Sequence, residues 1–124
     1  MPNVEQTSGW SSLRPFSPTE IYCAPAVPSG PGVFVIFNPA TLAGLSGMIN
    51  SVYIGHSDNL LEEIGRQVPN GGEEFTYFLA PSGRLQSIHK HLYDTAPFKK
   101  DSADPRGNPD REVALPPLWQ VNNN

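Results

Sequence analysis

One short stretch of the chain holds three side chains that could act on a phosphate ester. The segment SVYIGHSDNLLEEIGRQV, residues 51–68, contains Tyr53, His56 and Arg66. A hydroxyl or another base can handle a proton, and a guanidinium can stabilise negative charge that builds up on a phosphate. The simpler interpretation is that Tyr53 packs against a sheet and that Arg66 pairs with a neighbouring glutamate on a helix surface.

The three histidines, His56, His89 and His91, are the side chains that could bind a metal ion. His89 and His91 are two residues apart on a predicted helix, about 200° around its axis, so their rings diverge. His56 lies in another element and could approach only one of them. Two imidazoles without a carboxylate make a poor Mg²⁺ site, because that ion prefers oxygen ligands. We therefore expect surface histidines and no bound metal or other cofactor.

Three segments are predicted to be strands. GVFVIF (32–37) and SVYIG (51–55) are short runs of β-branched and aromatic residues, and the first is apolar on both faces, which is typical of a buried central strand. They most simply form an antiparallel hairpin with a long loop. In EEFTYFLA (73–80), Phe75, Tyr77 and Leu79 alternate with Thr76 and Phe78, which predicts a third strand.

Capping residues and apolar spacing predict the helices. Ser17 and Pro18 begin a short helix, and Asn59 with Glu62 has capping-box spacing at the start of a second. A third helix is predicted over residues 84–96 from its apolar stripe. Helices that cover a small sheet give an α+β fold, here with a three-stranded antiparallel sheet flanked by helices.

Prolines set the predicted limits of the domain. The chain has 14 prolines in 124 residues, and they crowd residues 15–39 and 97–117. This distribution indicates irregular, Pro-rich arms around one core, with Trp119 as the residue that would pin the C-terminal arm. The chain is divided into an N-terminal arm with a short helix, a central domain and a Pro-rich tail, residues 1–27, 28–100 and 101–124.

Composition narrows the compartment and the partners. The formal net charge is −4, which disfavours nucleic-acid binding, although Arg84, Lys90, Lys99 and Lys100 form a local basic segment. Cys23 is the single cysteine, which fits a reducing compartment. Because the sequence has neither a membrane-length apolar run nor a visible signal peptide, we expect a soluble, cytoplasmic protein without membrane contact.

The order of motifs resembles the GIY-YIG endonuclease domain. The resemblance rests on GVF at 32–34, on VYIG at 52–55 and on the HSDNLLEEI that follows, and it covers residues 28–100. Family nucleases are understood to use two motif tyrosines, an arginine on the first helix and a metal-binding glutamate on the second. The predicted order of strands and helices agrees with that family.

The resemblance also implies that most of the catalytic groups are replaced. The first motif tyrosine falls on Phe34, the second on Tyr53, the helix arginine on Glu63 and the metal glutamate on His89. Tyr53 is thus the one group retained, although Arg66 lies close enough to Glu63 on the helix to compensate. The alignment places Phe34, Glu63 and His89 around one groove beside Tyr53.

Three functions remain open at this point. The first is a non-catalytic binding or interaction module, with a nucleic-acid or protein partner contacting the groove or residues such as His56, Lys90, Lys99 and Lys100. The second is a divergent Mg²⁺- or Mn²⁺-dependent DNA endonuclease that uses Tyr53 with Arg66 in a positively charged concavity. The third discards the resemblance and gives the Pro- and Trp-rich arm a role in self-assembly.

Overall fold

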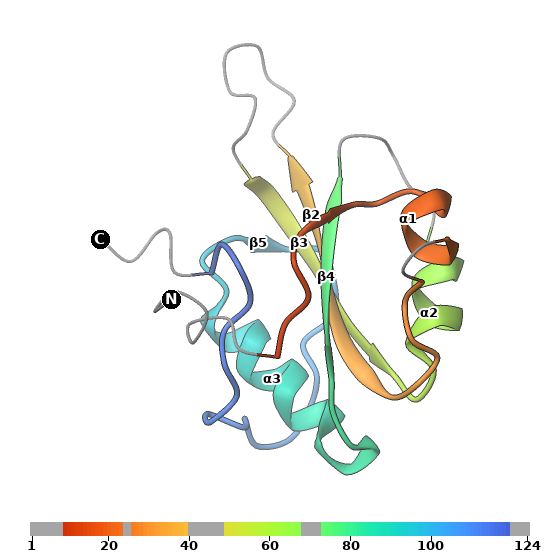
Figure 1. Ribbon diagram of the computed structural model, residues 1–124. Coiled ribbons are helices and arrows are strands. Elements are labelled where there is room, and N and C mark those ends of the chain that lie inside the picture. Colours follow the sequence, from red (N-terminus) through yellow and green to blue (C-terminus); the bar gives the residue numbers. More distant parts are fainter. Residues whose placement is uncertain (1–8, 24–25, 40–48, 68–72, 120–124) are drawn as a thin grey trace, which may run out of the picture.

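A computed structural model describes residues 9–23, 26–39, 49–67 and 73–119 (Figure 1). Its centre is a set of three antiparallel strands, β2 (Gly32–Pro39), β3 (Ile49–Ser57) and β4 (Glu74–Leu79). Strand β2 lies in the middle and pairs with both of the others. The α+β class, the three predicted strands and the antiparallel β2–β3 pair are therefore confirmed.

The sheet is larger than the predicted three strands. A two-residue strand, β1 (Arg14–Pro15), pairs with β4, and another, β5 (Lys99–Lys100), runs parallel to β3. The result is a mixed five-stranded sheet in the order β1-β4-β2-β3-β5. Two-residue strands are too short to show alternation in a sequence, and their partners are distant along the chain, so the prediction missed both.

The first two helices begin at the predicted caps. Helix α1 (Pro18–Tyr22) is capped by Ser17, and helix α2 (Leu60–Arg66) by Asn59. In each case the cap side chain accepts a hydrogen bond from the backbone N–H three residues later. These bonds satisfy N–H groups that the first turn of a helix leaves unpaired.

The helices divide between the two faces of the sheet. A 3₁₀ turn, η2 (Ser82–Arg84), leads into helix α3 (Leu85–Thr95). Figure 1 shows α3 on one face and α1 with α2 on the other. No helix among the described residues is long and apolar enough to cross a membrane.

Strand β2 builds a core on both faces of the sheet. Val33, Val35 and Phe37 belong to the cluster under α3, whereas Phe34 and Ile36 belong to the cluster under α1 and α2. All five are buried, as expected for a strand without a polar face. Neighbouring positions on each strand therefore serve different faces, and this decides which side chains can form a site together.

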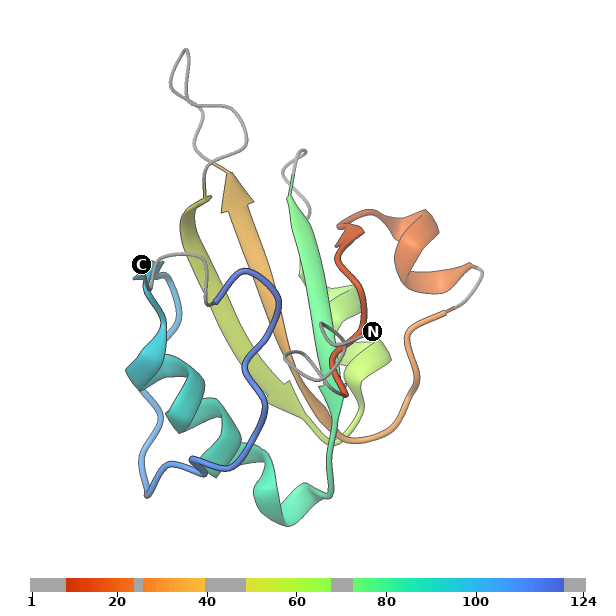
Figure 2. The same ribbon diagram turned by 60° about the vertical axis from the view of Figure 1, so that its left-hand side comes forward.

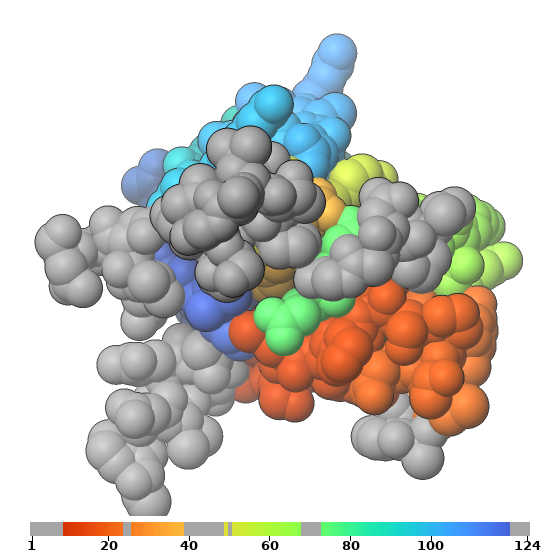
Figure 3. All heavy atoms as spheres, turned by 90° about the horizontal axis from the view of Figure 1, so that it is seen from above, coloured from red at the N-terminus to blue at the C-terminus, as the bar shows by residue number. Residues whose placement is uncertain are grey.

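The segments outside the sheet complete the core. Trp10 and Trp119 are both buried in the α3-side cluster, and the Trp10 indole N–H donates to the Ala114 carbonyl at 2.7 Å. Trp119, predicted to hold the tail, is 1% exposed. Figure 3 looks down on the molecule and shows the N-terminal segment (orange) and the region around β5 (cyan) at opposite sides of it.

A glycine allows the central packing between β2 and β3. A Cβ atom at Gly55 would lie 2.6 Å from Cζ of Phe34, whose ring is fully buried. Gly55→Ala is therefore expected to lower the free energy of unfolding by about 1–3 kcal/mol, through overpacking. Chemical denaturation would measure the change.

Gly83 provides the matched control for that substitution, because a Cβ atom there would meet nothing within 4 Å. Gly83→Ala is expected to change stability by less than about 0.5 kcal/mol. Equal losses in the two variants would contradict a specific clash at Gly55.

Candidate functional site

The two motif positions on the strands lie side by side on the α2 face. Phe34 and Tyr53 stack with ring centroids 6.1 Å apart. Phe34 is 0% exposed and Tyr53 is half-buried. The ring at position 34 therefore fills the core above Gly55 and, as phenylalanine, has no hydroxyl to transfer a proton.

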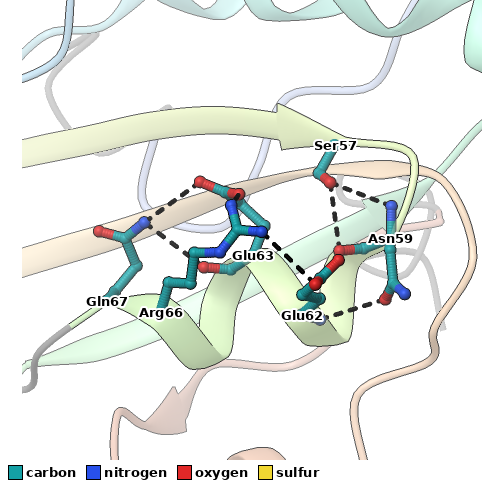
Figure 4. Close-up of polar contacts among 6 residues, drawn as sticks. All are labelled: Ser57, Asn59, Glu62, Glu63, Arg66 and Gln67. Atoms are coloured by element: carbon teal, nitrogen blue, oxygen red, sulfur yellow. Dashed lines mark hydrogen bonds and ion pairs between the residues drawn. The ribbon is translucent and has the colours of Figure 1, made fainter.

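The polar side chains of α2 pair with one another (Figure 4). Arg66 Nη1 lies 2.9 Å from Glu63 Oε1, and Arg66 Nη2 lies 3.4 Å from Glu62 Oε2. The Gln67 amide also donates to the backbone carbonyl of Glu63. Glu63, where the resemblance would place an arginine, thus binds Arg66, and the Arg66 guanidinium is shared between two glutamates.

The hollow beside Tyr53 is acidic where the described residues line it. This cavity, of about 180 Å³, is bordered by an aromatic and aliphatic floor and by a polar rim: Phe16, Ile36, Asn38, Tyr53, Gln67, Glu73 and Asp101. None of these residues is a lysine or an arginine, and two are carboxylates. Among the described lining residues, a phosphate that entered the cavity would therefore find no lysine or arginine side chain to bind it.

Arg66 borders a different hollow. That second, wider concavity has a volume of about 500 Å³, and it lies between α1 and α2 with Tyr22, Asn59 and Gly65 among its walls. Tyr53 and Arg66 therefore do not line the same cavity. The arrangement expected of a divergent nuclease, with both residues around one positive concavity, is not formed by the described side chains.

Two of the three histidines, His56 and His89, form a pair on the face of the sheet opposite to Tyr53. His56 Nδ1 and His89 Nδ1 lie 2.9 Å apart, which is hydrogen-bonding distance. His56 lies three residues after Tyr53 on β3, so their side chains point to opposite faces of the sheet. Because His89 belongs to α3, the histidine pair lies on the α3 side. Of the three positions expected around the groove beside Tyr53, Phe34 stacks with Tyr53. Glu63 is not among the described residues that line the cavity, and His89, paired with His56, is separated from Tyr53 by the sheet.

Burial disfavours the charged form of both histidines in this pair. It lowers the pKa of His89 to about 4, with His56 adding to the effect and Asp104 opposing it. The pKa of His56 is lowered as well, chiefly by burial and against the attraction of Asp58 and Glu63. His89 is 8% exposed, so the expectation of a surface histidine is wrong for this ring, and its Nε2 atom has no hydrogen-bond partner among the described residues. The described residues include no group of three or more His, Cys, Asp or Glu side chains placed to hold a metal.

The predicted basic segment is largely paired. Lys90 Nζ lies 3.2 Å from Asp94 and 3.0 Å from Asp104, and hydrogen bonds to Asp104 and then Asp94 raise its pKa. Arg84 pairs with Asp110 at 2.7 Å. Lys100 lies over the Tyr93 ring, 4.8 Å from its centroid, and Lys99 is exposed.

Three acidic residues of the tail make contacts that the sequence did not predict. Asp104 pairs with Lys90 of α3, Asp110 pairs with Arg84 of η2, and Asp101 lines the cavity beside Tyr53. No local sequence pattern predicts such contacts, because each joins residues that are far apart in the chain. One useful signal was present: Tyr53 and His56 are an odd number of residues apart on one strand, which places them on opposite faces. Comparisons of the chain with models of known protein families, with curated proteins and with solved structures gave no match.

Proposed function

We propose that this chain is a GIY-YIG-like domain without nuclease activity, and that it acts as a binding or interaction module. The strand order supports the family part of the proposal. The segment with the first motif is the central strand, and the segment with the second motif is its antiparallel neighbour, followed by helix, strand and helix. This is the order that the motifs imply.

The charge beside Tyr53 is the observation that carries the loss of activity. Phosphodiester cleavage requires positive charge around a phosphate whose negative charge grows in the transition state. The described residues around Tyr53 instead offer Glu73 and Asp101, and Arg66 is held by Glu62 and Glu63 outside this cavity. A phosphate there would therefore lack stabilisation by positive charge in the transition state of cleavage.

Two further positions support the same conclusion. Phe34 cannot donate or accept a proton, and its ring is packed into the core. His89 stands where the family has a metal-binding carboxylate, and its Nδ1 atom faces His56 on the other side of the sheet. The residues that build the fold are kept, among them Asn59 as a helix cap and Gly55 beneath Phe34. A scaffold retained without its chemistry is typical of a domain that binds.

The experiment that tests this proposal is a plasmid-nicking assay with Mg²⁺ or Mn²⁺. Wild-type protein and Tyr53→Phe are expected to leave supercoiled DNA intact to the same extent as buffer. Phenylalanine keeps the ring that packs against Phe34, so the variant should fold normally and isolate the hydroxyl. Metal-dependent nicking by wild type that disappears in Tyr53→Phe would overturn the proposal.

A further inference from the structure

The cavity beside Tyr53 lies where several strands begin or end. Figure 2 shows that β2 ends, and that β3 and β4 begin, at the same end of the sheet. Asn38 comes from the end of β2, Glu73 directly precedes β4, and Asp101 directly follows β5. Gln67, the residue after α2, completes the polar rim. Side chains that are far apart in the sequence therefore converge on this cavity.

The protein holds the Asp101 carboxylate in place. Its Oδ2 atom accepts from Ser51 Oγ at 2.6 Å and from Asn38 Nδ2 at 3.1 Å. The Asp101 backbone N–H donates to the Val52 carbonyl at 2.8 Å. These bonds use one carboxylate oxygen, and within the described part of the chain the other, Oδ1, accepts no hydrogen bond. Because the carboxylate is already oriented, a ligand that binds to it does not have to order it.

The two amide side chains of the rim direct their N–H groups into the protein. Asn38 Nδ2 has two acceptors, one of which is Asp101. Gln67 Nε2 donates to the Glu63 carbonyl at 3.4 Å and lies 3.5 Å from Glu63 Oε2. The amide oxygens of Asn38 and Gln67 and the Tyr53 hydroxyl form no hydrogen bond with another described residue. The polar atoms that remain for a ligand are therefore mostly acceptors.

A rim of acceptors favours a ligand that donates hydrogen bonds and carries positive charge. Glu73, which is 7% exposed, and Asp101 supply negative charge. A guanidinium has several N–H donors in one plane and no acceptor. It is also weakly hydrated and stacks on aromatic rings, and the Tyr53 and Phe16 side chains line the cavity. An ammonium group concentrates its charge on one strongly hydrated nitrogen, which suits a single carboxylate better than acceptors spread around a rim.

The size of the cavity limits the ligand to a small head group. Its volume of about 180 Å³ is below the roughly 300–1,000 Å³ of pockets that enclose drug-sized ligands. One flat charged group at the end of a slender chain fits this space. A divalent metal ion is also small, but it needs more oxygen ligands than the two carboxylates and two amides that line the cavity among the described residues.

We propose that the cavity beside Tyr53 binds a guanidinium group, presented either by an arginine of a partner protein or by a small free guanidine. The inference rests on the proposed function, because it takes the domain to be a binding module, and it names the chemistry of the partner. Asp101 Oδ1 accepts from one edge of the guanidinium. The amide oxygens of Asn38 and Gln67 accept from its remaining N–H groups.

NMR titration of isotope-labelled protein with blocked amino acids, in EDTA, tests the inference. Nα-acetyl-arginine amide is expected to shift the backbone amide signals of Tyr53, Gln67 and Asp101. It should bind about tenfold more tightly than Nα-acetyl-citrulline amide, because hydrogen bonds between charged groups are stronger than those of a neutral donor. Citrulline has nearly the same shape as arginine but carries a neutral urea group, so the comparison isolates the charge. Nα-acetyl-lysine amide should bind more weakly than the arginine probe.

Asp101→Asn removes the charge that faces the guanidinium, and it should weaken binding of the arginine probe about tenfold. Asp104→Asn is the matched control. It removes the same charge from the same part of the chain, but Asp104 pairs with Lys90 and is not among the described residues that line the cavity. Its affinity should stay within about twofold of wild type, because salt screens a distant charge. Both aspartates are exposed, so both variants should fold normally.

Two further probes distinguish the sources of the guanidinium. If the blocked tripeptide Gly-Arg-Gly binds at least as tightly as methylguanidine, the site accepts an arginine of a partner protein. If methylguanidine binds and the tripeptide does not, the ligand is a small free guanidine. Either result supports a guanidinium site.

Equal affinities for the arginine and citrulline probes, or equal affinities of Asp101→Asn and Asp104→Asn for the arginine probe, would overturn the inference. So would shifts at the cavity residues caused by Mg²⁺ or Ca²⁺, without EDTA, when the arginine probe causes none. Failure to bind arginine by a protein that also fails to nick DNA would overturn this inference alone. Nicking that is lost in Tyr53→Phe would overturn the proposed function, whether or not arginine binds.

Discussion

Trp119→Ala is expected to lower the free energy of unfolding by about 3–5 kcal/mol. The indole is 1% exposed and meets Phe37 and Phe98 edge to face, with ring centroids 6.0 and 5.6 Å apart. Its N–H also donates to Thr95 Oγ1 at 3.2 Å. Truncation would open a cavity between the tail, the sheet and α3. Denaturation in urea, followed by circular dichroism, would measure the loss.

Trp119→Phe is the matched variant. It keeps an aromatic ring in contact with the core but loses the hydrogen bond to Thr95 and part of the ring volume, so its loss should be clearly smaller. If Trp119→Ala cost less than about 1 kcal/mol, the tail would not be part of the core.

Acidification is expected to destabilise the protein through the histidine pair. The pKa of His89 is lowered from 6.5 to about 4, so the folded state resists taking up a proton that the unfolded state binds readily. The stabilising contribution of neutral His89 is fully present above the pKa that this histidine has in the unfolded state. It is lost as the pH falls from about 6.5 towards 4. A difference of that size corresponds to roughly 3 kcal/mol. The reason is geometric as well: a cation at His89 would be buried beside His56, 2.9 Å away.

His89→Leu removes the titrating group with the largest shift and should reduce the pH dependence of stability between pH 7 and pH 5. His56 and His91, whose pKa values are also lowered, should retain a smaller part of it. His91→Leu is the control on the same helix. The pKa of His91 is also lowered, by burial and then by Arg111, but only that of His89 falls as far as about 4. A pH dependence that survives in His89→Leu and disappears in His91→Leu would contradict this assignment.

Local chemistry explains which parts of the fold the sequence could predict. The caps Ser17 and Asn59 act within one turn, so the starts of α1 and α2 could be predicted from local sequence. The continuous apolar run of β2 indicates burial on both faces, so the central strand could be predicted as well. Strands β1 and β5 depend on partners far along the chain, and two residues carry no alternation. Their positions follow from packing that only the folded chain provides.

The candidate site shows the same division. Phe34 and Tyr53 were expected beside one groove, and their rings stack because they lie on neighbouring strands with fixed register. The spacing of His89 and His91 indicated that His56 could approach only one of them, but not which one, because the face of the sheet that a helix covers depends on packing and not on the helix sequence alone. The sequence could not predict Asp101 beside Tyr53 either, since that contact needs the tail to return along β3.

A single-turnover cleavage measurement tests the central claim most directly. Purified protein in excess over labelled duplex, nicked and branched DNA, with Mg²⁺ or Mn²⁺, would be followed beside a buffer blank. The carboxylates around Tyr53 and the pairing of Arg66 predict product formation no faster than in the blank on every substrate. Product that requires the metal, forms faster than in the blank and is lost in Tyr53→Phe would contradict the claim.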